Sequence, residues 1–310
     1  YNFVLLLVKV FWDFKMEKMP LPKEYLNLIN EAENILLKER ETGVFGGGKL
    51  DKGLVKIEGN EKLIVIGDIH GDLQSINYII KESKFLKSKN SMLIFLGDYI
   101  DRGEYSPQVL YKVLNLKLLF PGRVVLLRGN HEGPEDLQAS PHDLPHQLLN
   151  NYKEDGEKIY FKIKELFNAL PHAALVEGKY LFLHGGPPHN ASSINDYANA
   201  YETHPEKSFL EEILWNDPIE NFKGVLPSPR GAGKLFGVNV TNDALKVLGV
   251  KIIIRGHEPK NEGFGFNHNG KVLTLFSRLG APYFNSSASY LEINQKTGDF
   301  IIKKFTQKHY

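Results

Sequence analysis

Leu63-Ile64-Val65-Ile66-Gly67-Asp68-Ile69-His70-Gly71 is an apolar run that ends at a glycine and then supplies a carboxylate and an imidazole. A short apolar run closed by glycine is typical of a buried strand with an exposed end. Asp68 and His70 are two positions apart, and extended residues at that spacing point to the same side. We therefore expect these two side chains to bind one metal ion together.

Four further apolar runs end in the same way. Strands are expected at residues 92–96, 124–127, 180–183 and 251–254, and each is followed by a turn that contains glycine. In chain order, these turns supply Asp98, Asn130, His184 and His257. In open α/β sheets, ligands gather beyond the carboxyl ends of the strands, so we expect all these side chains to converge on one crevice.

Segments with helical spacing lie between and around these strands. Amphipathic helices are predicted at residues 21–40, 74–85, 109–120, 159–168 and 243–248. Closing strands are expected at residues 272–276, 289–293 and 300–305. Strands that alternate with helices indicate an α/β fold. No internal repeat or linker interrupts the pattern, which favours one domain over residues 21–310 after an N-terminal extension at residues 1–20.

Two stretches lack periodicity and are expected to be surface loops. Residues 133–151, rich in Pro, His, Asp and Gln, are predicted to hold at most a turn of helix, and residues 190–209 are polar. His142 and His146 are four apart, which on a helix would make a metal pair. Pro145 between them argues against a regular helix, so we do not assign them to a metal site.

Composition limits the functions that the chain can have. Of its 310 residues, 42% are hydrophobic and 24% are charged, with a formal net charge of +1 and no cysteine. Disulfides, thiolate metal sites and cysteine nucleophiles are thereby excluded. Near-neutrality gives no reason to expect nucleic acid or a membrane as a partner. The apolar run at residues 3–12 is shorter than the roughly 20 residues of a membrane span, so a cytoplasmic location is expected.

The six candidate ligands exceed what one tetrahedral ion needs. They suit two ions about 3.5 to 4 Å apart that share one carboxylate and leave positions open for water and substrate. Oxygen and nitrogen ligands without sulfur favour manganese, iron or zinc over calcium. Polar residues at a strand end often only cap nearby backbone, but that explanation does not account for metal-competent side chains at all five strand ends.

Five motifs follow one another in a characteristic order. They are Gly67-Asp68-Ile69-His70-Gly71, Gly97-Asp98-Tyr99-Ile100-Asp101-Arg102-Gly103, Gly129-Asn130-His131-Glu132, His184-Gly185-Gly186 and Arg255-Gly256-His257-Glu258. Similar short matches occur at residues 214–218, at Arg230-Gly231 and at residues 275–277. Together they resemble the PPP family of serine/threonine protein phosphatases, over roughly residues 21–305.

This resemblance implies a calcineurin-like metallophosphoesterase fold, in which a central β-sandwich of mixed sheets is flanked by helices in four layers. It implies a single catalytic domain with two divalent metal ions, manganese being expected and iron or zinc being the alternatives. By motif, Asp68 and His70 would bind the first ion, Asp98 would bridge, and Asn130, His184 and His257 would bind the second. The implied activity is a metal-dependent hydrolase of phosphorylated proteins, with a hydroxide that both ions activate as the nucleophile.

The motifs also suggest which side chains contact the substrate. The planar forks of Arg102 and Arg230 match phosphate oxygens, and Asn130 is expected to contact the phosphate as well as a metal. For each arginine, the alternative is a surface salt bridge. Arg128 and Arg255 precede glycines and are expected to pair with carboxylates instead of touching substrate.

A proton donor for the leaving group is expected next to these ligands. His131 follows Asn130 and is not needed as a ligand, so it is placed to protonate the leaving alkoxide. Asp101 is expected to orient its ring. His172, between Pro171 and Ala173, is interpreted as a core histidine.

Two segments depart from the eukaryotic members of the family. Residues 133–151 replace a helical segment, and residues 278–285 lack the usual cysteine-containing loop, although Tyr283 is placed to reach the site. Both segments would border the substrate groove, so specificity, inhibitor sensitivity and regulatory partners stay open.

Two other functions are compatible with these motifs. A hydrolase of dinucleoside polyphosphates, or of another small phosphate ester, would use the same ligands, with Tyr99, Tyr105 and Phe264 as the candidates for base stacking. An inactive scaffold would have lost ligands, and all six are present.

Overall fold

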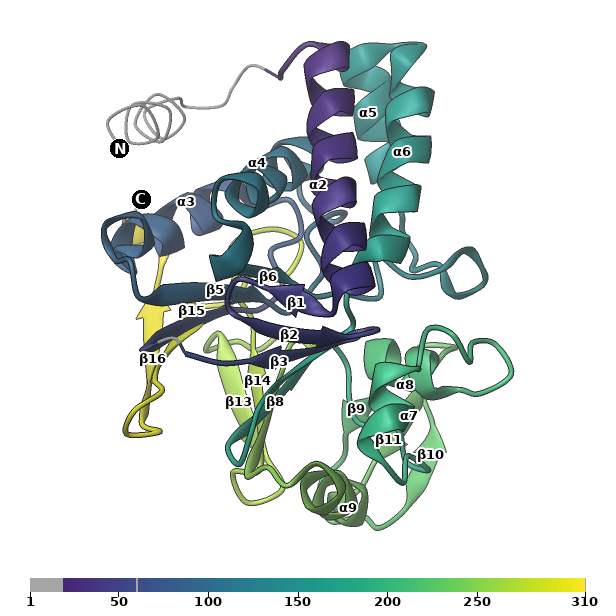
Figure 1. The fold of residues 1–310 in the computed structure, drawn as a ribbon, viewed down its shortest axis with the longest axis vertical. Coiled ribbons are helices and arrows are strands. Elements are labelled where there is room, and N and C mark those ends of the chain that lie inside the picture. The colour runs from purple at the N-terminus through teal and green to yellow at the C-terminus, as the bar shows by residue number, and fades with distance from the viewer. Residues whose placement is uncertain (1–18, 60, 310) are drawn as a thin grey trace.

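A computed structural model of the chain describes residues 19–59 and 61–309 (Figure 1). The larger sheet has the strand order β1 (Val44–Phe45), β2 (Gly48–Asp51), β3 (Leu54–Ile57), β7 (Ala173–Val176), β8 (Tyr180–Leu183), β12 (Ile252–Arg255), β14 (Val272–Leu275) and β13 (Phe264–Asn267). The second sheet has the order β16 (Phe300–Phe305), β15 (Ala288–Asn294), β4 (Lys62–Ile66), β5 (Ser91–Phe95) and β6 (Val124–Leu126). A small third sheet has the order β10 (Val225–Pro227), β11 (Lys234–Phe236) and β9 (Asp217–Pro218).

Helices cover the outer faces of the two large sheets (Figure 1). The five-stranded sheet is covered by α2 (Pro22–Thr42), α3 (Leu73–Glu82), α4 (Ser106–Leu119), α5 (Leu144–Tyr152) and α6 (Asp155–Ala169). The eight-stranded sheet is covered by α7 (Ile194–Ala198), α8 (Phe209–Trp215) and α9 (Val238–Leu248). Single 3-10 turns lie at Phe85–Lys87, Pro121–Arg123, Glu135–Leu137 and Gln307–His309. The four layers confirm the predicted α/β sandwich.

Strand β4 shows why an unbroken apolar run was needed. Leu63 and Val65 point into the core between the two sheets, whereas Ile64 and Ile66 point into the core beneath the helices. Successive residues of a strand face opposite sides, so a strand that is buried on both faces must be apolar at every position. All four side chains are fully buried.

The strand directions bring the motifs together. Strands β4, β5 and β6 are parallel, as are β8, β12 and β14 in the other sheet. The carboxyl ends of both sets meet where Asp68 forms a parallel bridge to Phe276. Across this junction, the ring of His184 bonds to the carbonyl of Leu96. The predicted crevice is therefore a seam between the ends of two sheets.

The predictions for the two aperiodic stretches were wrong in part. Residues 133–151 contain α5, and Pro145 stands in its first turn, where a missing N–H costs nothing. Residues 190–209 contain α7, which Ser193 caps in a capping box with Asp196. In both cases the helix is short, so it has too few turns to give a clear periodic signal.

Other elements were predicted less completely: strands β1–β3, β7, β9–β11 and β13 were not predicted, and α9 begins at Val238 instead of at residue 243. Helix α2 ends where Gly43 adopts a left-handed conformation at φ 69°. No helix within residues 19–59 and 61–309 is long and apolar enough to cross a bilayer. The apolar run at residues 3–12, and with it most of the predicted extension at residues 1–20, lies outside the described residues.

Candidate metal centre

Asp68, His70 and Asp98 form the first half of the site. His70 Nε2 lies 3.3 Å from Asp98 Oδ2 and 3.9 Å from Asp68 Oδ2. The other ring nitrogen, Nδ1, donates to the carbonyl of Ile100 at 2.8 Å. This bond leaves the Nε2 lone pair directed at the carboxylates, the arrangement in which histidine binds a metal.

Asn130, His184 and His257 form the second half, and Asp98 lies between the two halves. His184 Nε2 is 3.3 Å from Asp98 Oδ1 and 2.9 Å from the side-chain oxygen of Asn130. Asp98 thus presents one oxygen to each half, an arrangement that suits a bridging carboxylate. Asp68 also accepts the backbone N–H of His257 at 2.9 Å, which ties the loop after β4 to the loop after β12.

The backbone at these loops is held in uncommon conformations. His70, Asp98 and His257 have φ values of 43°, 55° and 71°, and Asp101 and Arg102 have 65° and 67°. Residues other than glycine seldom adopt positive φ, and each instance costs on the order of 1 to 3 kcal/mol. Such strain clusters where surrounding structure enforces a functional geometry.

The buried carboxylates at the site favour the binding of a cation. Asp68 and Asp98 are only 1% and 2% exposed. Burial raises the pKa of Asp68 to about 6 and lowers the pKa of His70 to about 3. Burial alone would also raise the pKa of Asp98, but His184, His131 and His70 together hold it well below its usual range. Two buried carboxylates that lie beside His70, whose ring burial keeps neutral, favour a divalent ion.

The side chain of Asn130 provides a separate test of whether metal ions fit. Its oxygen lies 2.9 Å from His184 Nε2 and 3.0 Å from His257 Nδ1. Nδ1 of His184 donates its proton to the carbonyl of Leu96, so Nε2 carries only a lone pair whenever the ring is neutral. Lone pairs at this distance repel unless a proton or a cation lies between them, or the amide turns its nitrogen to the rings. Oxygen and imidazole donors converging in this way fit a divalent metal.

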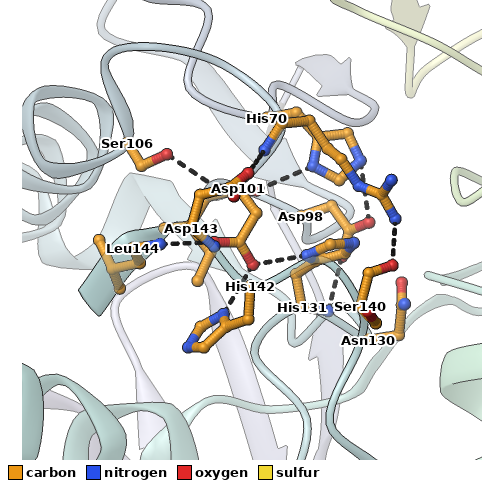
Figure 2. A network of polar contacts seen from close by, with 12 residues as sticks. His70, Asp98, Asp101, Ser106, Asn130, His131, Ser140, His142, Asp143 and Leu144 are labelled. Carbon is orange, nitrogen blue, oxygen red and sulfur yellow. Dashed lines mark hydrogen bonds and ion pairs between the residues drawn. The ribbon is translucent and has the colours of Figure 1, made fainter. Parts of the chain in front are cut away.

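Asp101 and His131 lie beside the ligands, as expected (Figure 2). His131 Nδ1 is 2.7 Å from Asp101 Oδ2, and the backbone N–H of His131 donates to Asp98 Oδ1 at 3.1 Å. Burial opposes a charge on His131, but Asp98 and Asp101 outweigh it and raise the pKa of the ring. His131 also offers a ligand atom in one three-residue group with His70 and Asp98, so it lies close to the first half of the site.

Glu132 is a site residue that the sequence analysis did not single out. Its carboxylate accepts the backbone N–H groups of Asp98, Tyr99 and Gly129 at 2.8, 2.9 and 3.1 Å. Burial and the neighbouring Asp98 raise its pKa to about 8. Glu132 thereby joins the loop after β5 to the loop after β6. Its place in the motif that begins at Gly129 is the feature of the sequence from which this role could have been predicted.

The two arginines predicted to bind phosphate have different surroundings. Arg102 Nη2 donates to the carbonyl of Ser140 at 2.7 Å. Arg230 Nε pairs with Asp217 at 2.7 Å, and Asp217 also pairs with Arg255 at 2.8 Å. The salt bridge that was the alternative for Arg230 is therefore present, although it uses Nε and not the terminal nitrogens.

Of the two arginines expected to pair with carboxylates, only Arg255 does so, with Asp217 and Glu258. The prediction for Arg128 was wrong. Arg128 instead donates to the carbonyl of Glu132 at 2.7 Å and to the amide oxygen of Asn168 at 2.9 Å.

The aromatic residues considered for contact with a substrate differ in burial and in position. Tyr283 stacks on the ring of His70 with centroids 5.9 Å apart, so it reaches the site as predicted. Tyr99 is buried and donates to the carbonyl of Leu127, which leaves no face for a base. Phe264 belongs to β13, and Tyr105 is 41% exposed. His172 is buried and bonds to the carbonyl of Tyr197, in agreement with a core histidine.

Known proteins share both the sequence pattern and the fold. Residues 61–261 match the calcineurin-like phosphoesterase family. A probable serine/threonine-protein phosphatase of Encephalitozoon cuniculi is 33% identical over 254 residues, which are 80% of this chain and 53% of that protein. A serine/threonine-protein phosphatase of Caenorhabditis elegans is 31% identical over 77% of this chain and 51% of its own length. The chain spans about half the length of these relatives.

A solved structure extends the agreement to the whole chain. The serine/threonine phosphatase from Saccharomyces cerevisiae with similarity to human phosphatase PP5 aligns with a TM-score of 0.78. The alignment covers 98% of this chain and 95% of that one, at 24% identity. At this identity the likeness concerns the fold.

Proposed function

The chain belongs to the calcineurin-like phosphoesterase family, and on this premise we propose that it is a metal-dependent serine/threonine protein phosphatase. The observation that carries the proposal is the position of Asp98, with one oxygen 3.3 Å from His70 and the other 3.3 Å from His184. A carboxylate between two sets of ligands, next to a buried Asp–His pair, suits hydrolysis of a phosphate ester.

The ligands in this proposal are Asp68, His70, Asp98, Asn130, His184 and His257. Two divalent ions at this site, with manganese as our expectation, would supply the positive charge that activates water and offsets the charge of the phosphoryl group. The protein holds the imidazole rings for this purpose through their outer nitrogens, as His70 does with Ile100 and His184 with Leu96.

The other side chains would bind the phosphate and move the proton. Asp101 holds Nδ1 of His131, so Nε2 is the nitrogen that can protonate the leaving alkoxide. The raised pKa of His131 supports this role, because a proton donor must be protonated before the reaction. Arg102, Arg230 and Asn130 would bind the phosphate oxygens.

Phosphorylated proteins are the proposed substrates. The names of the relatives support this choice, and the net charge of +1 gives no support for nucleic acid or a membrane as a partner. We keep as part of the proposal a single catalytic domain over residues 21–310, an extension at residues 1–20 and a cytoplasmic location.

The test compares substrates at one metal concentration. Purified protein, titrated with manganese, is assayed on phosphoserine, phosphothreonine and phosphotyrosine peptides and on dinucleoside polyphosphates. We expect the highest kcat/KM on the phosphoserine or phosphothreonine peptides. A higher kcat/KM on the dinucleotides would replace the proposal with the alternative, and a higher value on phosphotyrosine would change the residue specificity.

A further inference from the structure

Asp101 holds more hydrogen bonds than the orientation of His131 requires (Figure 2). Its Oδ2 is 2.7 Å from His131 Nδ1 and 2.8 Å from His142 Nδ1. Its Oδ1 accepts the backbone N–H groups of Asp143 and Leu144 at 2.8 and 2.9 Å. The carboxylate is fully buried, so these contacts fix it within the protein.

His142 is itself held from both sides. Its Nε2 is 2.8 Å from the hydroxyl of Tyr160, which lies on α6. A carboxylate only accepts, so His142 must carry a proton on Nδ1, and its Nε2 then accepts from the tyrosine hydroxyl. Tyr160, His142, Asp101 and His131 therefore form a continuous chain of hydrogen bonds.

The surrounding segment makes the arrangement rigid. We call residues 140–147 the clamp segment. Its Ser140 carbonyl accepts from the guanidinium of Arg102, and its Asp143 carboxylate accepts the backbone N–H of Arg102 at 3.0 Å. Its Gln147 bonds to the backbone at Gly103 and Ser106 at 2.8 and 3.0 Å. The loop that carries Asp101 is thus held along its length by the clamp segment.

We propose that His142 is a positioning residue for the proton donor His131, acting through Asp101; this inference rests on the proposed phosphatase function. Both imidazoles donate to the same carboxylate oxygen, so His142 adds to the backbone N–H groups on Oδ1 a contact that holds Oδ2 in place against His131. A cavity of about 250 Å³ lined by His131, His142 and Tyr160 lies next to the pair. Loss of the His142 imidazole would leave Asp101 Oδ2 without its second ring N–H donor and weaken its hold on His131.

The kinetic test depends on the basicity of the leaving group. A serine alkoxide is a strong base and needs a proton from His131, whereas 4-nitrophenolate leaves without one. In His142→Phe we expect kcat on a phosphoserine peptide to fall about 10-fold or more, and kcat on 4-nitrophenyl phosphate to fall less than about threefold. KM should stay within about twofold on both substrates, because His142 does not contact the phosphate.

Three variants serve as comparisons. His142→Asn keeps an N–H near the position of Nδ1, and should recover most of the kcat lost in His142→Phe. Tyr160→Phe removes only the outer hydrogen bond, and should show a smaller loss of the same kind. His146→Phe changes an exposed histidine on the same segment, and should leave both activities unchanged.

A measurement that does not depend on activity tests the geometry. Nitrogen-detected NMR of ¹⁵N-histidine-labelled protein should show His142 as the Nδ1–H tautomer, assigned by its loss in His142→Phe. The Nε2–H tautomer would overturn the inference. Equal losses on the two substrates would also overturn it, because they indicate a merely structural role. If the wild-type protein hydrolyses neither substrate, the proposed function itself is wrong, whatever tautomer His142 has.

Discussion

The ligand loops and the clamp segment build the same site in different ways. The ligand loops are the turns after β4, β5, β6, β8 and β12, and each places its side chain within a few residues of a strand end. The clamp segment, residues 140–147, follows no strand, and it reaches Asp101 from 41 residues further along the chain. The position of each proposed metal ligand thus depends on local geometry, whereas the orientation of His131, the proposed proton donor, depends on a tertiary contact.

This comparison predicts that substitutions in the ligand loops cause loss of metal. Substitutions in or near the clamp segment should preserve metal binding and change only the proton transfer. The largest effect should come from chelation, which we expect to abolish phosphatase activity. It should also lower the melting temperature, because ions that bind only the folded state add about 2.7 kcal/mol when present at 100 times their Kd. Calorimetry with and without chelator checks this, and an unchanged melting temperature would contradict a metal site built into the fold.

Asp98→Asn should have the next largest effect. The change removes the shared charge between the two halves, so we expect loss of at least one ion per chain. The fall in kcat should exceed the roughly 10 to 100-fold that loss of an outer ligand partner causes. Metal analysis and steady-state kinetics measure both quantities. Two tightly bound ions and normal turnover in this variant would rule out the binuclear arrangement.

His131→Asn separates chemistry from metal binding. We expect kcat on a phosphoserine peptide to drop about 10²-fold or more, because the proton donor is lost. Metal content should equal that of the wild-type protein, since the six ligands are intact. If turnover is nearly unchanged, His131 is only structural and the proton comes from elsewhere.

The two arginines give a graded comparison. Arg102→Ala should lower kcat/KM by about 10²-fold, because a positioned charge on the phosphate is lost. Arg230→Ala should cost less, because Asp217 shares that guanidinium and part of its exposed charge is screened. Parallel kinetics on one phosphopeptide decide the order, and a larger loss for Arg230 would reverse our ranking.

The smallest effect is expected for Gln147→Ala within the clamp segment. The change removes the hydrogen bonds to Gly103 and Ser106, each worth about 0.5 to 1.5 kcal/mol. The free energy of unfolding should fall by about 1 to 3 kcal/mol, with metal content preserved. Urea denaturation measures the change. Loss of metal in this variant would show that metal binding by the ligand loops depends on the clamp segment.

The sequence alone was sufficient to predict the layered fold and which side chains converge at the seam between the two sheets. Each ligand is a short step from a buried strand, and strands buried on both faces must be apolar throughout, so both signals are local. Asp101 and His131 could be predicted for the same reason, since both lie inside strand-end motifs.

Tertiary structure decided the rest. The bond between His142 and Asp101, the choice of Arg128 for a carbonyl and an amide, and the sharing of Asp217 by Arg230 and Arg255 all join residues that no short pattern relates. His142 and His146 were not assigned to a metal site from their spacing, and in the fold His142 faces Asp101 whereas His146 faces solvent. The end of a strand determines the position of the residues that follow it. The packing of segments distant in sequence determines which groups their side chains bond to.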